Sequence, residues 1–317
     1  MRIKKILFIG LNYHGYTDAI ADEIKNQYEC DLDYIDIQPR NFYWNFVKVL
    51  TPNLYKLLLS RYHEYKFNAH SNNNYDYIFF LQAHQVLDKN FLLLKDIFFN
   101  AKFVLYNWDS LENHNYLPKV KYFDRVITFD PLDAEINNFD YLPLFCTRDL
   151  QKLSKSSSND IFMIGNIVNP KRLDAVNAFI EFSLKNNLNF NTHLRVSLLV
   201  LFKLIIGRYS IKNLELKDAP TSKIKSFYES SSIVFDWANH SQAGLTMRAA
   251  EALGTGKKLI TNCEYLKRSE YAELGQVLVI DDRFDFSEVN EFISSNNSFQ
   301  PEKKLYIQNF TKALFKD

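Results

Sequence analysis

Short apolar runs alternate with longer segments of helical spacing through the first half of the chain. Five of these runs are predicted to be buried strands, at residues 5–9, 32–37, 77–82, 103–107 and 125–129. Runs that stay apolar at successive positions are typical of strands covered on both faces. Because strands and helices alternate, the pattern predicts a parallel sheet with helices on both faces.

The pattern lapses after Pro143 and resumes beyond residues 154–160 (SKSSSND), the most linker-like segment of the chain. The second half predicts a strand at 161–165, a helix at 171–185, an apolar region at 193–206, a helix at 222–230, a strand at 233–237, a helix at 245–253 and strands at 258–261 and 277–280. We therefore predict two doubly wound α/β domains, residues 1–153 and 154–300, with ligands at the carboxyl ends of strands and in the cleft between domains. Residues 301–317 are predicted to form a helix that packs back on the first domain.

Composition narrows the kinds of partner. The 317 residues are 47% hydrophobic, enough for more than one core. The chain has 38 Lys and Arg against 37 Asp and Glu, a net charge of +1. A chain with so little net charge has no overall positive potential that would attract nucleic acid, so any recognition of anions must be local. The three cysteines lie far apart, which argues against a disulfide scaffold and a zinc cluster.

Membrane contact is predicted to be peripheral at most. The most apolar stretch, residues 194–207, contains Lys203 and is shorter than the ~20 residues that span a bilayer. We expect no transmembrane helix and a cytoplasmic protein. The basic and aromatic segment 48–66 is interpreted as a core-facing helix pair, or else as an interfacial surface for a lipid-linked acceptor on the inner face of the membrane.

The segment from residue 235 to residue 262 is the most informative for chemistry. A strand ends near Trp237, a polar loop with Gly244 follows, and a helix then begins, whose free N–H groups and dipole suit a phosphate. Thr246 and Arg248 in the first turn can add directional bonds to a diphosphate. Glu251, one turn further on, is suited to accept two hydrogen bonds from a ribose diol.

This segment resembles the nucleotide-sugar glycosyltransferases of the GT-B architecture. The matching pieces are QAGLTMR from Gln242, EALG from Glu251 and KKLIT from Lys257, supported by IGNIVNPKR from Ile164, NWDS from Asn107 and FDPLD from Phe129. Together they look like the bacterial enzymes that build lipopolysaccharide and capsule glycans. The resemblance implies two Rossmann-like domains facing a cleft, a nucleotide-diphosphate sugar as donor, a glycan or lipid-linked acceptor, and no required metal or other cofactor.

The resemblance also implies which residues hold the donor: Gly165, Lys171, Arg172, His240, Gln242, Gly244, Leu245, Thr246, Arg248 and Glu251. One position departs from the pattern. Many retaining members carry a second Glu eight positions before the ribose Glu, where this chain has Ala243. The stereochemical outcome therefore stays open.

The first domain supplies the candidate catalytic residues Asp109 and His14. The loop from Gly10 to Gly15 (GLNYHG) does not match GxGxxG, and the resemblance makes its Asn12 and His14 candidates for contacting acceptor or donor. Asp109 follows the fourth strand, where it could take a proton from an acceptor hydroxyl if turnover inverts. His84, after the third strand, is a further candidate.

Each of these residues also has a structural interpretation. Asp109 could cap a helix after Ser110, and His14 and His240 could be ordinary loop histidines. Glu251 could be a solvated helix carboxylate, and Arg248 could belong to a surface ion pair. We interpret the chain as a glycosyltransferase of bacterial surface polysaccharide synthesis. The alternatives are a nucleotide-sugar epimerase of the same architecture and a non-catalytic carbohydrate-binding or assembly subunit.

Overall fold

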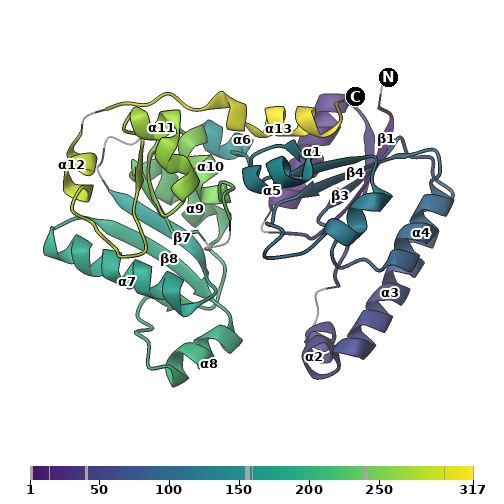
Figure 1. Cartoon of the computed structure of the whole chain (residues 1–317), viewed down its shortest axis with the longest axis horizontal. Coiled ribbons are helices and arrows are strands. Elements are labelled where there is room, and N and C mark those ends of the chain that lie inside the picture. The colour runs from purple at the N-terminus through teal and green to yellow at the C-terminus, as the bar shows by residue number, and fades with distance from the viewer. Residues whose placement is uncertain are drawn as a thin grey trace. The chain divides into compact units, whose positions relative to one another are not determined.

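The computed structural model describes residues 3–316, except for residues 14, 40, 41, 154–157, 159, 239–241 and 296. It divides into two compact units (Figure 1). The first unit comprises Met1–Leu142 together with Ile307–Asp317, and the second comprises Pro143–Tyr306.

The first unit is built on a six-stranded parallel sheet in the order β2-β1-β3-β4-β5-β6. Its strands are β1 (Lys5–Gly10), β2 (Asp31–Asp36), β3 (Tyr77–Leu81), β4 (Lys102–Asn107), β5 (Arg125–Thr128) and β6 (Asp140–Tyr141). Its helices are α1 (Tyr16–Tyr28), α2 (Phe42–Leu50), α3 (Pro52–Ala69), α4 (Asp88–Ile97), η1 (Leu117–Tyr122), α5 (Pro131–Asn137) and α13 (Ile307–Leu314). The central strands are buried along almost their whole length, as expected when helices cover both faces.

The second unit repeats this plan with the order β12-β11-β10-β7-β8-β9, again all parallel. Its strands are β7 (Ile161–Ile167), β8 (Phe190–Val196), β9 (Leu214–Glu215), β10 (Ile233–Asp236), β11 (Lys258–Thr261) and β12 (Val277–Val279). Its helices are α6 (Arg148–Gln151), α7 (Pro170–Lys185), α8 (Leu198–Ile206), α9 (Thr221–Ser230), α10 (Met247–Gly254), η2 (Glu264–Arg268), α11 (Glu270–Glu273), α12 (Val289–Ser294) and η3 (Lys303–Leu305). The predicted fold class, a doubly wound α/β sheet in each half, is confirmed.

The chain divides at residues 142 and 143, upstream of the predicted boundary at 153 and 154. Cys146 and Leu150 are buried in the core of the second unit, and Cys146 pairs with Tyr306 through a β-bridge. Leu305 also belongs to that core, so the chain returns to the first unit at Ile307 and not at residue 301. The boundary between the two units is therefore set by which side chains are buried in which core. The polar composition of the serine-rich segment predicted this boundary too far along the chain.

The C-terminal helix α13 is part of the first unit, where it lies against α1 (Figure 1). The Thr311 hydroxyl donates to the Gln27 side chain on α1 at 2.5 Å. The Arg125 guanidinium donates to the carbonyl oxygens of Ala313 and Leu314 at 2.7 and 3.0 Å. These contacts tie the end of the chain to the first sheet.

Each sheet has one position at which the strand order reverses. In the first unit it lies between β1 and β3, and in the second between β7 and β10. Loops leave these neighbouring strands toward opposite faces of the sheet, which opens a crevice at their carboxyl ends where ligands bind in such folds. The residues after β1, β3, β7 and β10 are therefore expected to carry the functional side chains.

Two apolar segments differ from the sequence interpretation. The region 193–206 is a strand followed by a helix, because the Ser197 side chain caps α8 by accepting from Val200 N at 3.3 Å. The pair α2–α3 buries Tyr55, Leu59 and Phe67, yet several of its apolar side chains are exposed, namely Phe46, Val49, Leu50, Leu54 and Leu57. Among the helices of the described chain, none has the length and apolar character needed to cross a bilayer.

Candidate functional site

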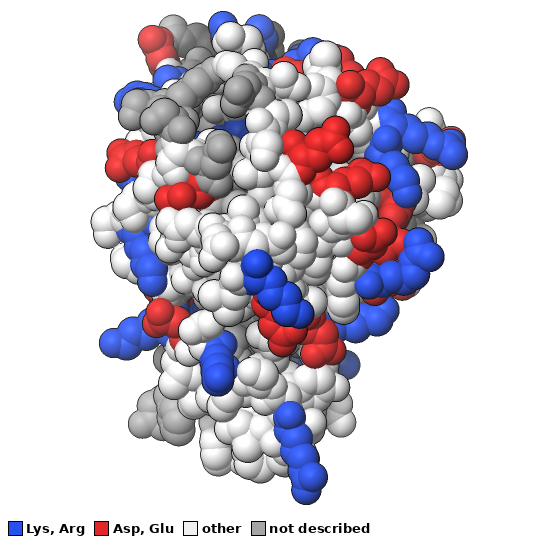
Figure 2. Space-filling model, turned by 90° about the vertical axis from the view of Figure 1, so that its left-hand side faces the viewer, with Lys and Arg blue, Asp and Glu red and all other residues white. Residues whose placement is uncertain are grey.

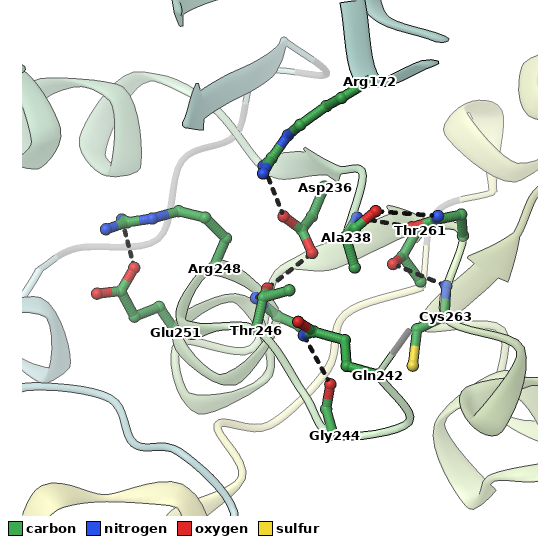
Figure 3. Close-up of polar contacts among 12 residues, drawn as sticks. Arg172, Asp236, Ala238, Gln242, Gly244, Thr246, Arg248, Glu251, Thr261 and Cys263 are labelled. Atoms are coloured by element: carbon green, nitrogen blue, oxygen red, sulfur yellow. Dashed lines mark hydrogen bonds and ion pairs between the residues drawn. The ribbon is translucent and has the colours of Figure 1, made fainter. Parts of the chain in front are cut away.

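In the second unit, the reversal between β7 and β10 brings together Arg172 and Asp236 (Figure 3). Asp236 ends β10, and Arg172 lies in the first turn of α7, which Asn169 caps by accepting from Arg172 N at 2.9 Å. The guanidinium Nη2 lies 4.0 Å from the Asp236 carboxylate. Gly165 on β7 leaves room for this arginine, because a Cβ there would lie 2.8 Å from Nη2.

Asp236 also receives the Thr246 hydroxyl, at 2.7 Å. Thr246 is the N-cap of α10, where its side chain accepts from Ala249 N at 3.0 Å. Figure 3 shows Arg172 and Thr246 approaching the Asp236 carboxylate from opposite sides. Burial raises the pKa of Asp236, while Arg172, the Thr246 hydroxyl and Arg248 act to lower it. The Thr246 hydroxyl therefore has two protein partners, and its contact with a diphosphate stays a prediction.

Glu251 is 1% exposed, so it is not the solvated carboxylate of the structural alternative. It forms an ion pair with Arg248 on the same helix and accepts the Tyr228 hydroxyl of α9 at 2.8 Å through the same carboxylate oxygen. Arg248 is itself only 13% exposed, so this is not a surface pair either. A ribose-binding role for Glu251 remains a prediction, and the carboxylate also has a structural role that the sequence did not indicate.

The remaining predicted donor residues have different surroundings. Gln242 donates to the Gly244 carbonyl at 3.2 Å, which tightens the loop before α10, and Leu245 is buried in the core. Lys171 is well exposed, and its Nζ lies 3.5 Å from the Asp282 carboxylate. Of the adjacent cations Lys171 and Arg172, only Arg172 pairs with the Asp236 carboxylate. His240 lies outside the described residues.

Two residues of this site are not among those that the sequence predicted. Asp236 reads as the last position of an apolar strand, and only its place at the strand end, before a polar loop, could have signalled a function. Tyr228 lies on a different helix from Glu251, and no local pattern could have paired them. Asn262 lies at the end of the informative segment, and its side chain holds the Ala238 backbone by accepting from Ala238 N at 2.7 Å.

In the first unit, Asp109 follows β4 and is held by residues from two loops. The Gln82 side chain, just after β3, donates to the Asp109 carboxylate, and His114 Nε2 lies 4.0 Å from the same oxygen. Burial raises the pKa of Asp109, while His114 and the Gln82 amide act to lower it. Gln82 has a φ of 67°, a left-handed conformation that is uncommon for a residue with a side chain.

His84 and His114 stack in this cluster, with ring centroids 4.1 Å apart and an interplanar angle of 9°. Burial, together with the neighbouring His114 and Lys48, lowers the pKa of His84 to about 4. Within the described chain, buried atoms of Gln82 (Oε1), His84 (Nδ1) and Gln85 (Oε1) have no hydrogen-bond partner. Unsatisfied buried polar atoms are uncommon and are expected where a ligand supplies the missing partners.

The capping alternative for Asp109 is wrong. No α-helix follows Ser110, since residues 111–114 form turns and η1 begins only at Leu117. Ser110 itself supports the turn by accepting from Asn113 N through Oγ at 3.4 Å. Asn12 is exposed in the loop after β1, and His14 lies outside the described residues. Within the described residues, no group of three or more His, Cys, Asp or Glu side chains could hold a metal ion.

No protein-family model matches this sequence, and no curated protein matches it. Solved structures do resemble its fold along almost the whole length. UDP-GlcNAc 2-epimerase from Methanocaldococcus jannaschii, in complex with UDP-GlcNAc and UDP, has a TM-score of 0.57 at 10% identity and covers 98% of this chain and 99% of its own. The catalytic domain of starch synthase IV from Arabidopsis thaliana, bound to ADP and acarbose, has a TM-score of 0.59 at 9% identity, over 100% and 96%.

A third similar structure is AviGT4, a glycosyltransferase involved in avilamycin A biosynthesis, with a TM-score of 0.52 at 9% identity over 98% of this chain and 93% of that one. The chain has the GT-B fold. At such identities the likeness concerns the fold alone, and it is shared by glycosyltransferases and epimerases. The reaction depends on the residues of the site and not on the fold.

Proposed function

We propose that this protein is a glycosyltransferase that takes its sugar from a nucleotide-diphosphate donor. The observation that carries the proposal is the pair of largely buried arginines, Arg172 and Arg248, at the carboxyl edge of a parallel sheet beside the N-terminus of α10. A helix N-terminus and guanidinium groups together form a site for a diphosphate that needs no net charge on the protein.

In this proposal Arg172 binds the donor diphosphate and Asp236 is a positioning residue. The Asp236 carboxylate lies 4.0 Å from the Arg172 guanidinium and orients it at the carboxyl edge of the sheet. Glu251, fixed by Arg248 and Tyr228, would bind the ribose. Gly165, Gln242 and Gly244 would shape the loops around the donor, and Lys171 and His240 remain candidates for its outer rim.

Asp109 in the first unit is proposed as the base that accepts the proton of the acceptor hydroxyl. Burial raises its pKa, and a carboxylate with a raised pKa is a stronger base once it is ionised. The unsatisfied atoms of Gln82, His84 and Gln85 are suited to a ligand rich in hydroxyl groups. His14 remains a candidate on the neighbouring loop.

The acceptor is proposed to be a glycan or a lipid-linked oligosaccharide of a bacterial surface polysaccharide, such as lipopolysaccharide or capsule. The resemblance of the sequence motifs supports this assignment. The exposed apolar residues of α2–α3, interspersed with Lys48, Lys56 and Arg61, support peripheral contact with the cytoplasmic membrane.

The second candidate is a nucleotide-sugar epimerase, favoured by the fold shared with UDP-GlcNAc 2-epimerase. One experiment separates the two. A panel of nucleoside diphosphates is ranked by the rise in melting temperature, since a ligand of the folded state stabilises it by mass action. The matching nucleotide sugars are then incubated with and without glycan acceptors. Release of nucleoside diphosphate that depends on acceptor supports transfer, and an altered sugar without acceptor supports epimerisation. If no nucleotide raises the melting temperature, both proposals fail.

A further inference from the structure

Helix α8 of the second unit has an outer face that is as apolar as its inner face. Leu204 is buried, and Val200 and Leu201 pack against the core of the unit. The opposite side carries five apolar side chains that are between 52% and 71% exposed, namely Leu198, Leu199, Phe202, Ile205 and Ile206. At about 100° per residue these five fall within an arc of roughly 120°. They form one continuous stripe, which we call the α8 stripe.

The charged residues of α8 and of the segment that follows it are all positive. Lys203 lies at the edge of the stripe, and Arg208 and Lys212 follow in the exposed segment that leads to β9. Between residues 182 and 214 the sequence has no Asp or Glu. The acidic residues that come next are already paired, Glu215 near His193 and Lys223, and Asp218 with Arg195. In the described chain, none of the three cations Lys203, Arg208 and Lys212 takes part in an ion pair.

Figure 1 places α8 at the lower end of the second unit. Figure 2 shows charged side chains of both signs over most of the face that it draws, whereas the lower end of that face is white with blue side chains. Tyr209 and Ile211 are also exposed in this part of the chain. Contiguous exposed apolar surface is uncommon on monomeric proteins and marks a binding surface.

We propose that the α8 stripe docks on an anionic phospholipid bilayer. A helix that lies in a membrane interface buries an apolar face among the acyl chains and places Lys and Arg near the lipid phosphates. The stripe supplies the apolar face, and the three cations supply the charge complementarity.

The first unit carries a second surface with the same chemistry. The exposed apolar residues of α2–α3 lie among four cations, Lys48, Lys56, Arg61 and Lys66, with Glu64 as the one acidic residue of that segment. Each unit therefore carries a surface that combines apolar and basic groups. The proposal for α8 does not depend on the nucleotide site.

The test measures binding of the full-length protein to vesicles by co-sedimentation. One set of vesicles is phosphatidylcholine, and the other is phosphatidylcholine mixed with phosphatidylglycerol. We expect the wild-type protein to bind the mixed vesicles more strongly. The double variant Phe202→Glu, Ile206→Glu removes two apolar side chains that would be buried among the acyl chains and adds repulsion from the anionic lipids, so its partition coefficient should fall about 10- to 100-fold.

The matched control is Leu184→Glu, Leu274→Glu, which makes the same change at apolar residues of similar exposure elsewhere in the second unit. It should keep most of the binding. Melting temperature and nucleoside diphosphate affinity, measured on both variants, report separately on folding and on the proposed donor site. The proposal is overturned if the wild-type protein does not bind anionic vesicles, or if both double variants lose binding equally. It is also overturned if the stripe mediates only self-association in sedimentation velocity.

Discussion

At the scale of single residues, Asp109 is held in place by the Gln82 amide and lies near His114, and it caps no helix. Asp109→Asn keeps the size of the side chain and an oxygen that can accept from Gln82. Because general-base catalysis contributes roughly 10²–10⁴-fold, we expect kcat to fall by that order with nucleotide affinity nearly unchanged. The measurement is steady-state kinetics together with calorimetric titration of nucleoside diphosphate.

The control for this prediction is Asp133→Asn. Asp133 lies on α5 and accepts from Leu111 N at 2.8 Å, in the loop that also carries Asp109. Its contact is therefore structural. Asp133→Asn should lower the melting temperature and leave kcat per folded molecule unchanged. Normal turnover by Asp109→Asn would refute the base role. So would a product that retains the anomeric configuration of the donor.

Glu251 and Tyr228 allow the ribose role to be separated from the structural one. Glu251→Gln removes the charge that would hold a ribose diol and pair with Arg248, so nucleoside diphosphate binding should weaken by about 1.5–3 kcal/mol. Tyr228→Phe removes only the hydroxyl that supports the carboxylate, at 2.8 Å. It should cost about 1 kcal/mol of folding stability with little loss of affinity. Calorimetry that shows equal affinities for Glu251→Gln and the wild-type protein would contradict the ribose role.

His84 should make the folding stability depend on pH. Its folded-state pKa of about 4 lies below the ordinary value of 6.5, chiefly because of burial, so the unfolded chain binds more protons. The associated stability is present above pH ~6.5 and is lost as the pH falls toward ~4. Since His84 is partly exposed, we expect a loss on the order of 1–2 kcal/mol over that interval. Denaturant unfolding of His84→Gln should show a shallower pH dependence, and parallel curves would contradict the prediction.

At the scale of elements, two glycines of the second unit should respond differently to the same substitution. A Cβ at Gly165 meets the movable end of the Arg172 side chain at 2.8 Å, whereas a Cβ at Gly254 meets the Cys146 Cβ at 2.5 Å. Gly165→Ala should displace Arg172 and weaken nucleoside diphosphate binding by roughly 3- to 10-fold with little change in melting temperature. Gly254→Ala should push α10 away from the 146 segment and destabilise folding by about 1–3 kcal/mol. Thermal unfolding and calorimetry on both variants check the contrast, and a reversed outcome would mean that Arg172 does not contact the donor.

At the scale of the whole molecule, we predict turnover that is independent of metal. The one Asp-x-Asp triplet in the sequence, Asp31 to Asp33, lies at the start of β2, at the opposite end of that strand from the carboxyl edge of the sheet. Asp33 there accepts the Tyr75 hydroxyl at 2.6 Å and lies 3.0 Å from Lys5 Nζ. Activity should therefore survive treatment with EDTA. Complete loss that Mn²⁺ or Mg²⁺ restores would refute the prediction.

The sequence by itself determined most of the strands, the alternation of strands and helices, and the fold class, because each depends on local periodicity and on burial of short apolar runs. It also indicated the loop and helix from Gly244 to Glu251 and the strand-end position of Asp109. It did not indicate the strands β6, β8 and β9. Only the tertiary structure decided which side chains meet. Arg172 meets Asp236 because the strand order reverses between β7 and β10, and Gln82 meets Asp109 because β3 and β4 are neighbours. Glu251 meets Tyr228 across two helices. The two residues of each pair lie apart in the chain. Sequence periodicity shows only which face of a helix or strand is buried, so it carries no information about which residue of another element that face contacts.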